Sequence, residues 1–252
     1  MNHQFLTRPV AIDYNPRAGN LTLPVRRAAQ QLAIEFAGTF LVVFFAAGAL
    51  AVDPWLKTAG EPVLGTLGAA LAYGLAVAAM TEIAGPVSGG HLNPAISLGA
   101  WATRRMGTWR LLGYALVQLA GAVAAAHALT ALMPDAAWQA AGLGTPALAS
   151  SLTRAQGMTV EAILTFAVSL AFFRTTSVSG RASGWTVGMA VAAAALVALP
   201  ITGAALNPAR AFGPALVSRE WANHGVWWVG PLAGGVLGAW LSRALESEDG
   251  AS

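Results

Sequence analysis

Two copies of the tripeptide Asn-Pro-Ala are the residues of this chain whose types and spacing are best suited to chemistry. They comprise Asn93, Pro94 and Ala95 in the first copy and Asn207, Pro208 and Ala209 in the second, 114 residues later. Asparagine is a strong helix N-cap, and proline suits the first helical position, where its missing N–H costs nothing. Each copy therefore predicts a helix start. The amide oxygen of each asparagine would cap its helix, leaving the NH₂ group free to donate to another molecule.

The same two helix starts would carry positive charge. Each helix N-terminus holds roughly half an elementary charge. If the two meet tip to tip, their field repels cations and protons, and asparagines that only donate would orient a water molecule and interrupt a chain of waters. The glycine-bearing stretches before the two copies would offer carbonyl oxygens along one side of the water-filled passage between the helix starts. These residues are Gly89, Gly90, His91, Gly203 and Ala205.

The composition places these motifs in a membrane. Of 252 residues, 56% are hydrophobic and only 10% are charged, whereas soluble domains carry roughly 25% charged residues. A spanning helix needs about 20 mostly apolar residues. Charge-free length and bounding Arg, Pro and Gly residues predict an all-α membrane protein with six spans, at 31–52, 61–83, 109–133, 157–174, 184–202 and 223–242.

Two further apolar pieces, 93–103 and 207–218, are too short to span. About a dozen helical residues cover roughly 18 Å, against a hydrocarbon core of about 30 Å. They are predicted to be re-entrant half-helices, because irregular backbone at membrane depth must line a cavity or be buried in protein.

The chain also repeats itself. Residues 88–97 match residues 202–211, and residues 35–40 match 161–166. Each half, about 31–133 and 157–242, then holds three spans and one half-helix. Three is odd, so the second half enters the membrane inverted, an arrangement that places the working site near the midplane.

Charge position predicts the orientation. If the N-terminus is inside, ten arginines lie on the cytoplasmic side, against three cations on the other side, Lys57, Arg154 and Arg219. This distribution obeys the positive-inside rule and predicts that both termini are cytoplasmic. Residues 1–28 are predicted to be a cytoplasmic tail rather than a signal peptide, because no short apolar core with a cleavage site precedes the first span.

Several classes of site are excluded or disfavoured. The chain has no cysteine, which excludes disulfides, thiolate catalysis and cysteine metal sites. Its four histidines lack metal-ligand spacing, and its cations are not clustered as nucleic-acid binding would require. We expect no metal, no cofactor and no nucleic-acid partner.

Three ionisable residues inside apolar stretches remain to be explained, together with one at a span end. An unpaired charge at the centre of a membrane helix costs at least about 2.5–3.5 kcal/mol, so Glu35 and Glu161 should face protein donors. Arg210, directly after the second Asn-Pro-Ala, is a functional candidate for the same reason. Glu82 ends the second predicted span, where either a surface or a functional role is open.

The stretches SGGHLNPA at 88–95 and TGAALNPARAFGPAL at 202–216 resemble the aquaporin, or major intrinsic protein, family, of bacterial type and in its water-channel branch. The likeness runs from Glu35 to about residue 240. It implies a passive channel with one pore per subunit, no cofactor, a homotetrameric assembly and a place in the cell (inner) membrane. It also implies a channel domain at 29–246, followed by a cytoplasmic tail at 247–252.

The resemblance also assigns roles to single residues. Glu35 and Glu161 would brace the two re-entrant loops, with a proton-coupled carboxylate as the rival interpretation. His91 would line the pore or fix its loop, with a titrating gate as the alternative. The outer constriction would be formed by Tyr73, Ala195, Ala204 and Arg210, and a slip of one residue would replace Ala195 by Ala194 or Leu196.

The predicted cargo depends on two conflicting signals. Ala195 stands where strict water channels place a histidine, which implies a wider and less polar constriction. Ala211, Ala215 and the pair Trp227-Trp228 resemble the water branch instead. We therefore expect water together with small neutral solutes such as glycerol, urea, ammonia and hydrogen peroxide. Because Ala204 supplies no thiol at the constriction, mercurials should not inhibit through that position.

The sequence leaves three alternative functions to consider. The first is an aquaglyceroporin-type solute facilitator. An ion-coupled secondary transporter would also use inverted repeats, but it would need a carboxylate exposed to cargo, and the candidates Glu35 and Glu161 match loop braces. An intramembrane hydrolase would need a nucleophile and a base, and no histidine sits in such a motif.

Overall fold

The computed structural model describes residues 22–249, and within them every regular element is a helix. The long helices are α1 (Thr22–Ala59), α2 (Gly65–Ser88), α4 (Thr108–Leu132), α6 (Arg154–Ser179), α7 (Gly184–Thr202) and α9 (Val226–Asp249). The short ones are α3 (Pro94–Ala102), α5 (Asp135–Ala140), the 3₁₀ turn η1 (Gly142–Gly144) and α8 (Pro208–Ser218). The predicted all-α architecture with two half-helices, α3 and α8, is confirmed.

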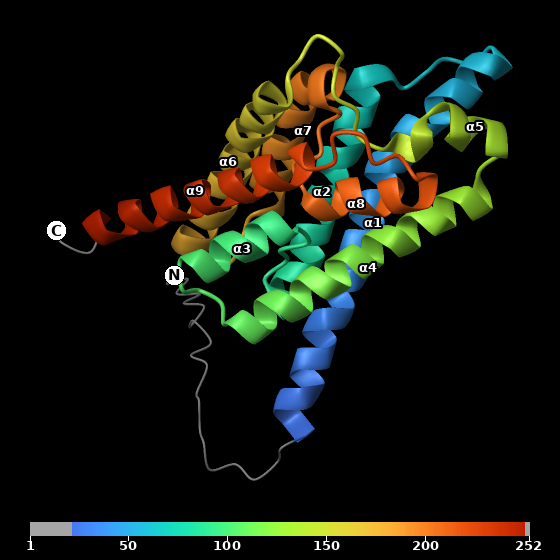
Figure 1. The fold of residues 1–252 in the computed structure, drawn as a ribbon. Coiled ribbons are helices and arrows are strands. Elements are labelled where there is room, and N and C mark those ends of the chain that lie inside the picture. Colours follow the sequence, from blue (N-terminus) through green and yellow to red (C-terminus); the bar gives the residue numbers. More distant parts are fainter. Residues whose placement is uncertain (1–21, 250–252) are drawn as a thin grey trace, which may run out of the picture.

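The packing repeats between the two halves, as the internal repeat predicts. Helix α1 packs against α4, and its counterpart α6 packs against α9, while α2 and α7 pack against each other between the halves. Each half-helix crosses over: α3 lies beside α9, and α8 lies beside α4 (Figure 1). The two halves are therefore interlocked through their half-helices.

Five of the helices are long and apolar enough to cross a membrane, namely α1, α2, α4, α6 and α7. Helix α9 is 24 residues long but does not reach the same hydropathy in the described part of the chain. Its packing against α6 repeats that of α4 against α1, and this position supports it as the sixth span. The multi-pass membrane architecture follows from these helices together.

Several helices run past their predicted ends, because acidic residues near those ends are hydrogen-bonded to neighbouring elements. Helix α2 continues beyond Glu82, whose carboxylate accepts from Gly184 N at 2.8 Å and from Arg181 Nη1 at 2.9 Å. Helix α1 continues beyond Asp53, which accepts from two backbone N–H groups at the start of α2. Glu82 thus joins α2 to the first turn of α7, which answers the open question of its role with a structural one.

Helix α1 also starts earlier and α9 ends later than predicted. Residues 22–28 and 247–249, which the sequence assigned to the tails, are helical. The remaining predicted tail residues, 1–21 and 250–252, lie outside the described residues. The division into a channel domain and two tails otherwise stays a prediction.

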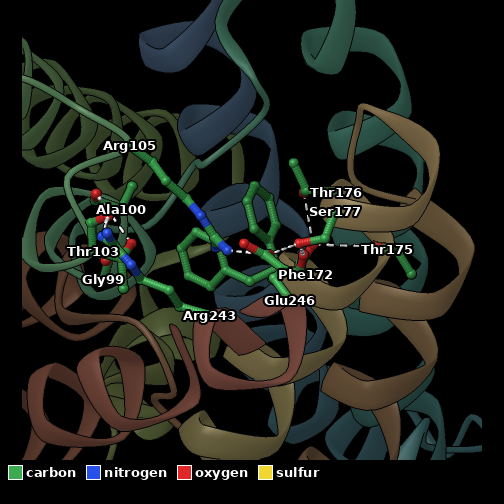
Figure 2. A network of polar contacts seen from close by, with 11 residues as sticks. Gly99, Ala100, Thr103, Arg105, Phe172, Thr175, Thr176, Ser177, Arg243 and Glu246 are labelled. Carbon is green, nitrogen blue, oxygen red and sulfur yellow. Dashed lines mark hydrogen bonds and ion pairs between the residues drawn. The ribbon is translucent and has the colours of Figure 1, made fainter. Parts of the chain in front are cut away.

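The C-terminal end of α9 holds the end of the first half-helix. Arg243 donates to the carbonyl of Thr103, directly after α3, and Glu246 pairs with Arg105 and accepts from Ser177 of α6 (Figure 2). The Arg105 guanidinium also lies over the Phe173 ring, 4.9 Å from its centroid. Three elements are therefore tied together at the point where α3 ends.

Close contacts between α9 and α6 depend on glycine. A Cβ added at Gly238 of α9 would lie 2.6 Å from the carbonyl oxygen of Phe166 and 2.7 Å from the Cβ of Ser169. Gly230 and Gly234 meet α6 in the same way. Small residues let helix backbones approach where lipid offers no hydrophobic driving force.

Gly238→Ala should therefore destabilise the protein. The added methyl group would meet backbone atoms of α6 that cannot move independently, and overpacking of this kind costs about 1–3 kcal/mol. Gly85→Ala is the matched control, because a Cβ at this helical glycine meets nothing within 4 Å and alanine is the better helix former. Thermal unfolding in detergent measures both; equal midpoints for the two variants would contradict the packing argument.

Candidate functional site

The two Asn-Pro-Ala copies start the two half-helices, as predicted. Asn93 has extended backbone and its side-chain oxygen accepts from Ala95 N at 2.8 Å. Asn207 does the same for Ala209 N at 2.9 Å. In both copies the proline takes the first helical position. Asparagine capping thus fixes the direction of each helix and leaves the amide nitrogen facing away from it.

The two helix starts meet across the molecule. Asn93 Nδ2 donates to the carbonyl oxygen of Leu206 at 2.9 Å, and Asn207 Nδ2 donates to that of Leu92 at 2.9 Å. One hydrogen of each amide therefore links the two loops, which corrects the expectation that both stay free. The second hydrogen of each amide has no acceptor among the described residues. The tip-to-tip meeting itself is observed.

This junction holds the backbone in a costly conformation. Leu92 and Leu206 adopt φ of 53° and 55°, a left-handed region that non-glycine residues avoid. Two residues before Leu206, Ala204 is also left-handed, with φ of 48°, whereas Gly90, with φ of 67°, adopts this region without strain. Such strain of about 1–3 kcal/mol per residue persists only where the surroundings enforce it.

Glu35 and Glu161 hold the two loops in this left-handed conformation, which is the bracing role that the resemblance implies. Glu161 accepts from Ala205 N at 3.0 Å, from Leu206 N at 2.7 Å and from the Thr202 hydroxyl at 2.7 Å. Glu35 accepts from His91 N at 2.9 Å, from Leu92 N at 2.7 Å and from the Ser88 hydroxyl at 2.6 Å. Both carboxylates are fully buried, so neither is placed to exchange protons with cargo.

Three contacts around these loops are not evident from the motifs. Gln118 of α4 donates to Glu35 at 2.8 Å, Tyr114 donates to the carbonyl of Ser88 at 2.8 Å, and Trp227 Nε1 donates to the carbonyl of Thr202 at 2.8 Å. The one available signal was Gln118, a lone amide inside a long apolar run. The Tyr114 and Trp227 bonds fix the helix ends from which the two re-entrant loops depart, and the Gln118 bond fixes the glutamate that braces the first loop.

A narrow cavity of about 20 Å³ adjoins the asparagine pair. That volume is close to the space needed by a single water. Its walls combine aliphatic side chains with a few polar ones, which is the lining expected of a selective passage. The polar members include Asn93, Asn207, Tyr73, Thr81 and His91.

The residues assigned to the outer constriction lie together in part. Tyr73, Ala195 and Ala204 belong to one buried cluster, and the Tyr73 hydroxyl donates to the carbonyl of Ala205 at 2.8 Å. That bond uses one lone pair of the Ala205 carbonyl, which was predicted to face the passage. The constriction formed by Ala195 and Ala204 with Tyr73 and Arg210 stays a prediction.

Arg210 is the least satisfied group of the site. Its side chain is 1% exposed, and its Nε and Nη1 atoms have no hydrogen-bond partner among the described residues. It lies in the first turn of α8, directly after the second Asn-Pro-Ala. A buried cation with unused donors in a membrane helix indicates a functional group.

Comparison with known proteins decides the family. A family model described as "Major intrinsic protein" matches residues 24–242. The chain belongs to the major intrinsic protein family. Its members are transmembrane channels rather than enzymes, so this chain is a multi-pass integral membrane channel and no catalytic residue is required.

Curated relatives within the major intrinsic protein family agree. The chain is 41% identical over 204 residues to "Aquaporin TIP4-4" of Zea mays, covering 79% of each chain. It is 41% identical over 213 residues to "Lens fiber major intrinsic protein" of Gallus gallus, covering 82% of this chain and 78% of the relative. It is 39% identical over 213 residues to "Aquaporin-5" of Homo sapiens, covering 82% and 77%.

A solved structure supports the same fold. The aquaglyceroporin from Plasmodium falciparum superposes with a TM-score of 0.72, covering 87% of this chain and 96% of that chain. Its sequence identity is 21%, so this likeness concerns the architecture alone.

Glu161→Gln should destabilise the conformation of the second re-entrant loop. Both carboxylate oxygens of Glu161 face backbone N–H groups, and an amide NH₂ would meet one of them donor to donor, at a cost of about 1–3 kcal/mol for the unsatisfied group. We expect lower thermal stability and severalfold lower channel flux in vesicles. Glu82→Gln is the control, because one amide oxygen can still accept from Gly184 N. Equal losses in both variants would count against the bracing role.

Proposed function

We propose that the protein is a passive channel for water that also passes small neutral solutes and excludes protons and ions. The observation that carries this proposal is the meeting of two asparagine-capped helix starts beside a cavity of about 20 Å³, which has room for about one water. Each asparagine retains one donor hydrogen toward the passage. Water accepts these hydrogens at its oxygen and moves down an osmotic gradient without a coupled ion.

Exclusion of cations follows from the same geometry. Two helix N-termini bring roughly half a positive charge each to the junction. The two buried glutamates beside it, Glu35 and Glu161, are turned to the loops and do not offset this charge. A water held by two donors has its lone pairs engaged and cannot accept a proton from its neighbour. Positive helix ends and fixed donors therefore act against protons and metal ions together.

The outer constriction is proposed to consist of Tyr73, Ala195, Ala204 and Arg210. Arg210 supplies the unused donors and a positive charge that repels cations. The two alanines add neither bulk nor a hydrogen-bonding group. The names of several relatives, including aquaporins of Zea mays and Homo sapiens, support water as cargo, whereas Ala195 favours the aquaglyceroporin-type alternative. We propose glycerol, urea, ammonia and hydrogen peroxide as the additional solutes.

The assembly and orientation are also proposals. We infer a homotetramer in the cell membrane with both termini in the cytoplasm. Large apolar side chains exposed along α2 and α7 support a surface that meets lipid or other subunits, among them Leu67, Leu71, Leu75, Trp185, Met189 and Val197. The excess of arginine on one side supports the orientation.

Vesicles containing the purified protein test the function directly. Stopped-flow light scattering should show fast water efflux with a low activation energy, unchanged by a pH gradient across the membrane. Parallel gradients of glycerol, urea and hydrogen peroxide give the solute range. Water flux no faster than in protein-free vesicles would refute the proposal, and uptake that disappears when the pH gradient is collapsed would favour a coupled transporter.

Ala195→His should narrow the constriction and add a polar group. We expect glycerol flux to fall much more than water flux, since a solute with a carbon skeleton needs the wider and less polar opening. Ala194→His provides the control one residue away. A larger effect at position 194, or equal loss of both fluxes at position 195, would show that the alignment of the constriction is wrong.

Ala204→Cys should create sensitivity to mercurials. The chain has no cysteine, so the unmodified channel offers no thiol and its water flux should be unaffected. A thiol at a constriction would bind mercury and block the passage, and a reducing thiol reagent should reverse the block. A cysteine placed at exposed Gly107 serves as the control; inhibition there, or none at position 204, would exclude Ala204 from the narrowest part.

A further inference from the structure

A buried polar chain lies behind the first helix start and has no counterpart behind the second. Gln118 Nε2 lies 2.8 Å from Glu35 Oε2 and 3.1 Å from Ser97 Oγ. Ser97 Oγ in turn lies 3.1 Å from His91 Nδ1. In the second repeat, alanines occupy the positions of His91 and Ser97, at 205 and 211. This network of hydrogen bonds therefore acts on the imidazole of His91, which only the first loop contains.

The direction of the first hydrogen bonds can be read from Glu35. Backbone N–H groups of His91 and Leu92 each donate to one oxygen of this carboxylate, so both oxygens act as acceptors. Gln118 must therefore face the carboxylate with its NH₂ group, since its carbonyl oxygen would be repelled. The two hydrogens of that NH₂ then point to Glu35 and to Ser97.

The bond from Gln118 determines which atom donates between Ser97 and the imidazole of His91. Its hydroxyl oxygen accepts from Gln118, so its own hydrogen needs another acceptor. Ser97 is fully buried, and among the described residues the one other polar atom in reach of Oγ is His91 Nδ1. A ring nitrogen that accepts carries no hydrogen, and a neutral imidazole then has its hydrogen on Nε2. The network assigns this tautomer, as such networks do when hydrogens are not seen.

We propose that Gln118 and Ser97 are positioning residues that hold His91 as its Nε2–H tautomer, so that the ring donates into the passage. The proposal deepens the proposed channel function and rests on it. His91 lines the same cavity as both asparagines, and Nε2 has no partner among the described residues. Edge contacts with Tyr114 and Phe172, at centroid distances of 5.4 and 5.5 Å, hold the ring plane.

The choice of tautomer matters for proton exclusion. In the Nε2–H form the ring presents a hydrogen to the cavity, and His91 joins Asn93 and Asn207 as a third nitrogen donor. In the other form a basic lone pair would face the water column and could take up a proton, then release it to the next water. Holding the hydrogen on Nε2 keeps a titratable base out of the passage.

Nitrogen NMR of the ring tests the tautomer itself. The chain has four histidines, so His91→Gln identifies the signals of His91 in protein labelled with ¹⁵N-histidine and placed in lipid. We expect a protonated Nε2 and an unprotonated Nδ1 at about pH 8, where imidazole is neutral. A hydrogen on Nδ1 in the unmodified protein would overturn the proposal. This measurement does not depend on transport, so a protein that carried no water would refute the function and leave the tautomer assignment standing.

Ser97→Ala tests the positioning role. The variant should fold, since Ala211 takes the equivalent place in α8 and is fully buried. We expect the His91 signals to shift toward the Nδ1–H form or a mixture, proton leak to rise above the unmodified level, and water flux to stay within about twofold because the asparagine junction is untouched. Unchanged tautomer populations would overturn the proposal.

Three further variants separate this role from general destabilisation. Ser97→Thr keeps the hydroxyl and should restore the original tautomer. Ser169→Ala removes another fully buried serine hydroxyl, which bonds to the Gly235 carbonyl at 2.7 Å, and should leave the His91 signals unchanged. Adding Ser97→Ala to His91→Gln should give no further rise in proton leak; an additional rise would show that Ser97 acts by another route and would overturn the proposal.

Discussion

Every structural feature of this channel depends on one requirement, that backbone groups at membrane depth find partners inside the protein. The two re-entrant loops cannot use helix hydrogen bonds, so each obtains its partners from two sources. A buried glutamate of the same half accepts from two successive N–H groups of the loop. The asparagine of the opposite half donates to the carbonyl of the loop's leucine, Leu92 or Leu206. Neither half can therefore supply all the partners of its own loop.

The approximate symmetry makes the exceptions informative. The bonds from Glu35 and Glu161 to their loops agree between the halves to within about 0.1 Å, as do the crossed asparagine bonds. Around this common frame the first half adds Gln118, Ser97 and His91, whereas the second half adds Arg210. The hydrogen-bonding groups on the two sides of the junction therefore differ in kind. A neutral donor serves one side and a charged donor serves the other.

Much of this arrangement could be predicted from the sequence because it depends on local rules. Capping by Asn93 and Asn207 follows from residue type, and the spans follow from apolar length. The inverted repeat follows from an odd number of spans in each half. The helix ends could be predicted less well, because Asp53 and Glu82 lie where apolar runs end, and only partners distant in sequence let α1 and α2 continue past them.

The crossed bonds could not be predicted from either motif by itself. The amide hydrogens of Asn93 were expected to be free, and finding Leu206 as an acceptor requires knowledge of how two segments 114 residues apart meet. The same holds for the chain from Gln118 to His91, which joins a helix, a half-helix and a loop. A lone amide in an apolar run indicates that a partner exists but does not identify it.

The hydroxyl of Tyr73 bears on selectivity at the proposed constriction. Because it donates to the Ala205 carbonyl, its hydrogen is not available to a permeant molecule. Ala195 and Ala204 have no side-chain donor at all. The unused hydrogens of Arg210 would then be the main polar contacts there, facing an apolar wall. A molecule that presents oxygen atoms on one side and carbon on the other suits such an opening, whereas a bare ion gains too little to replace its lost hydration.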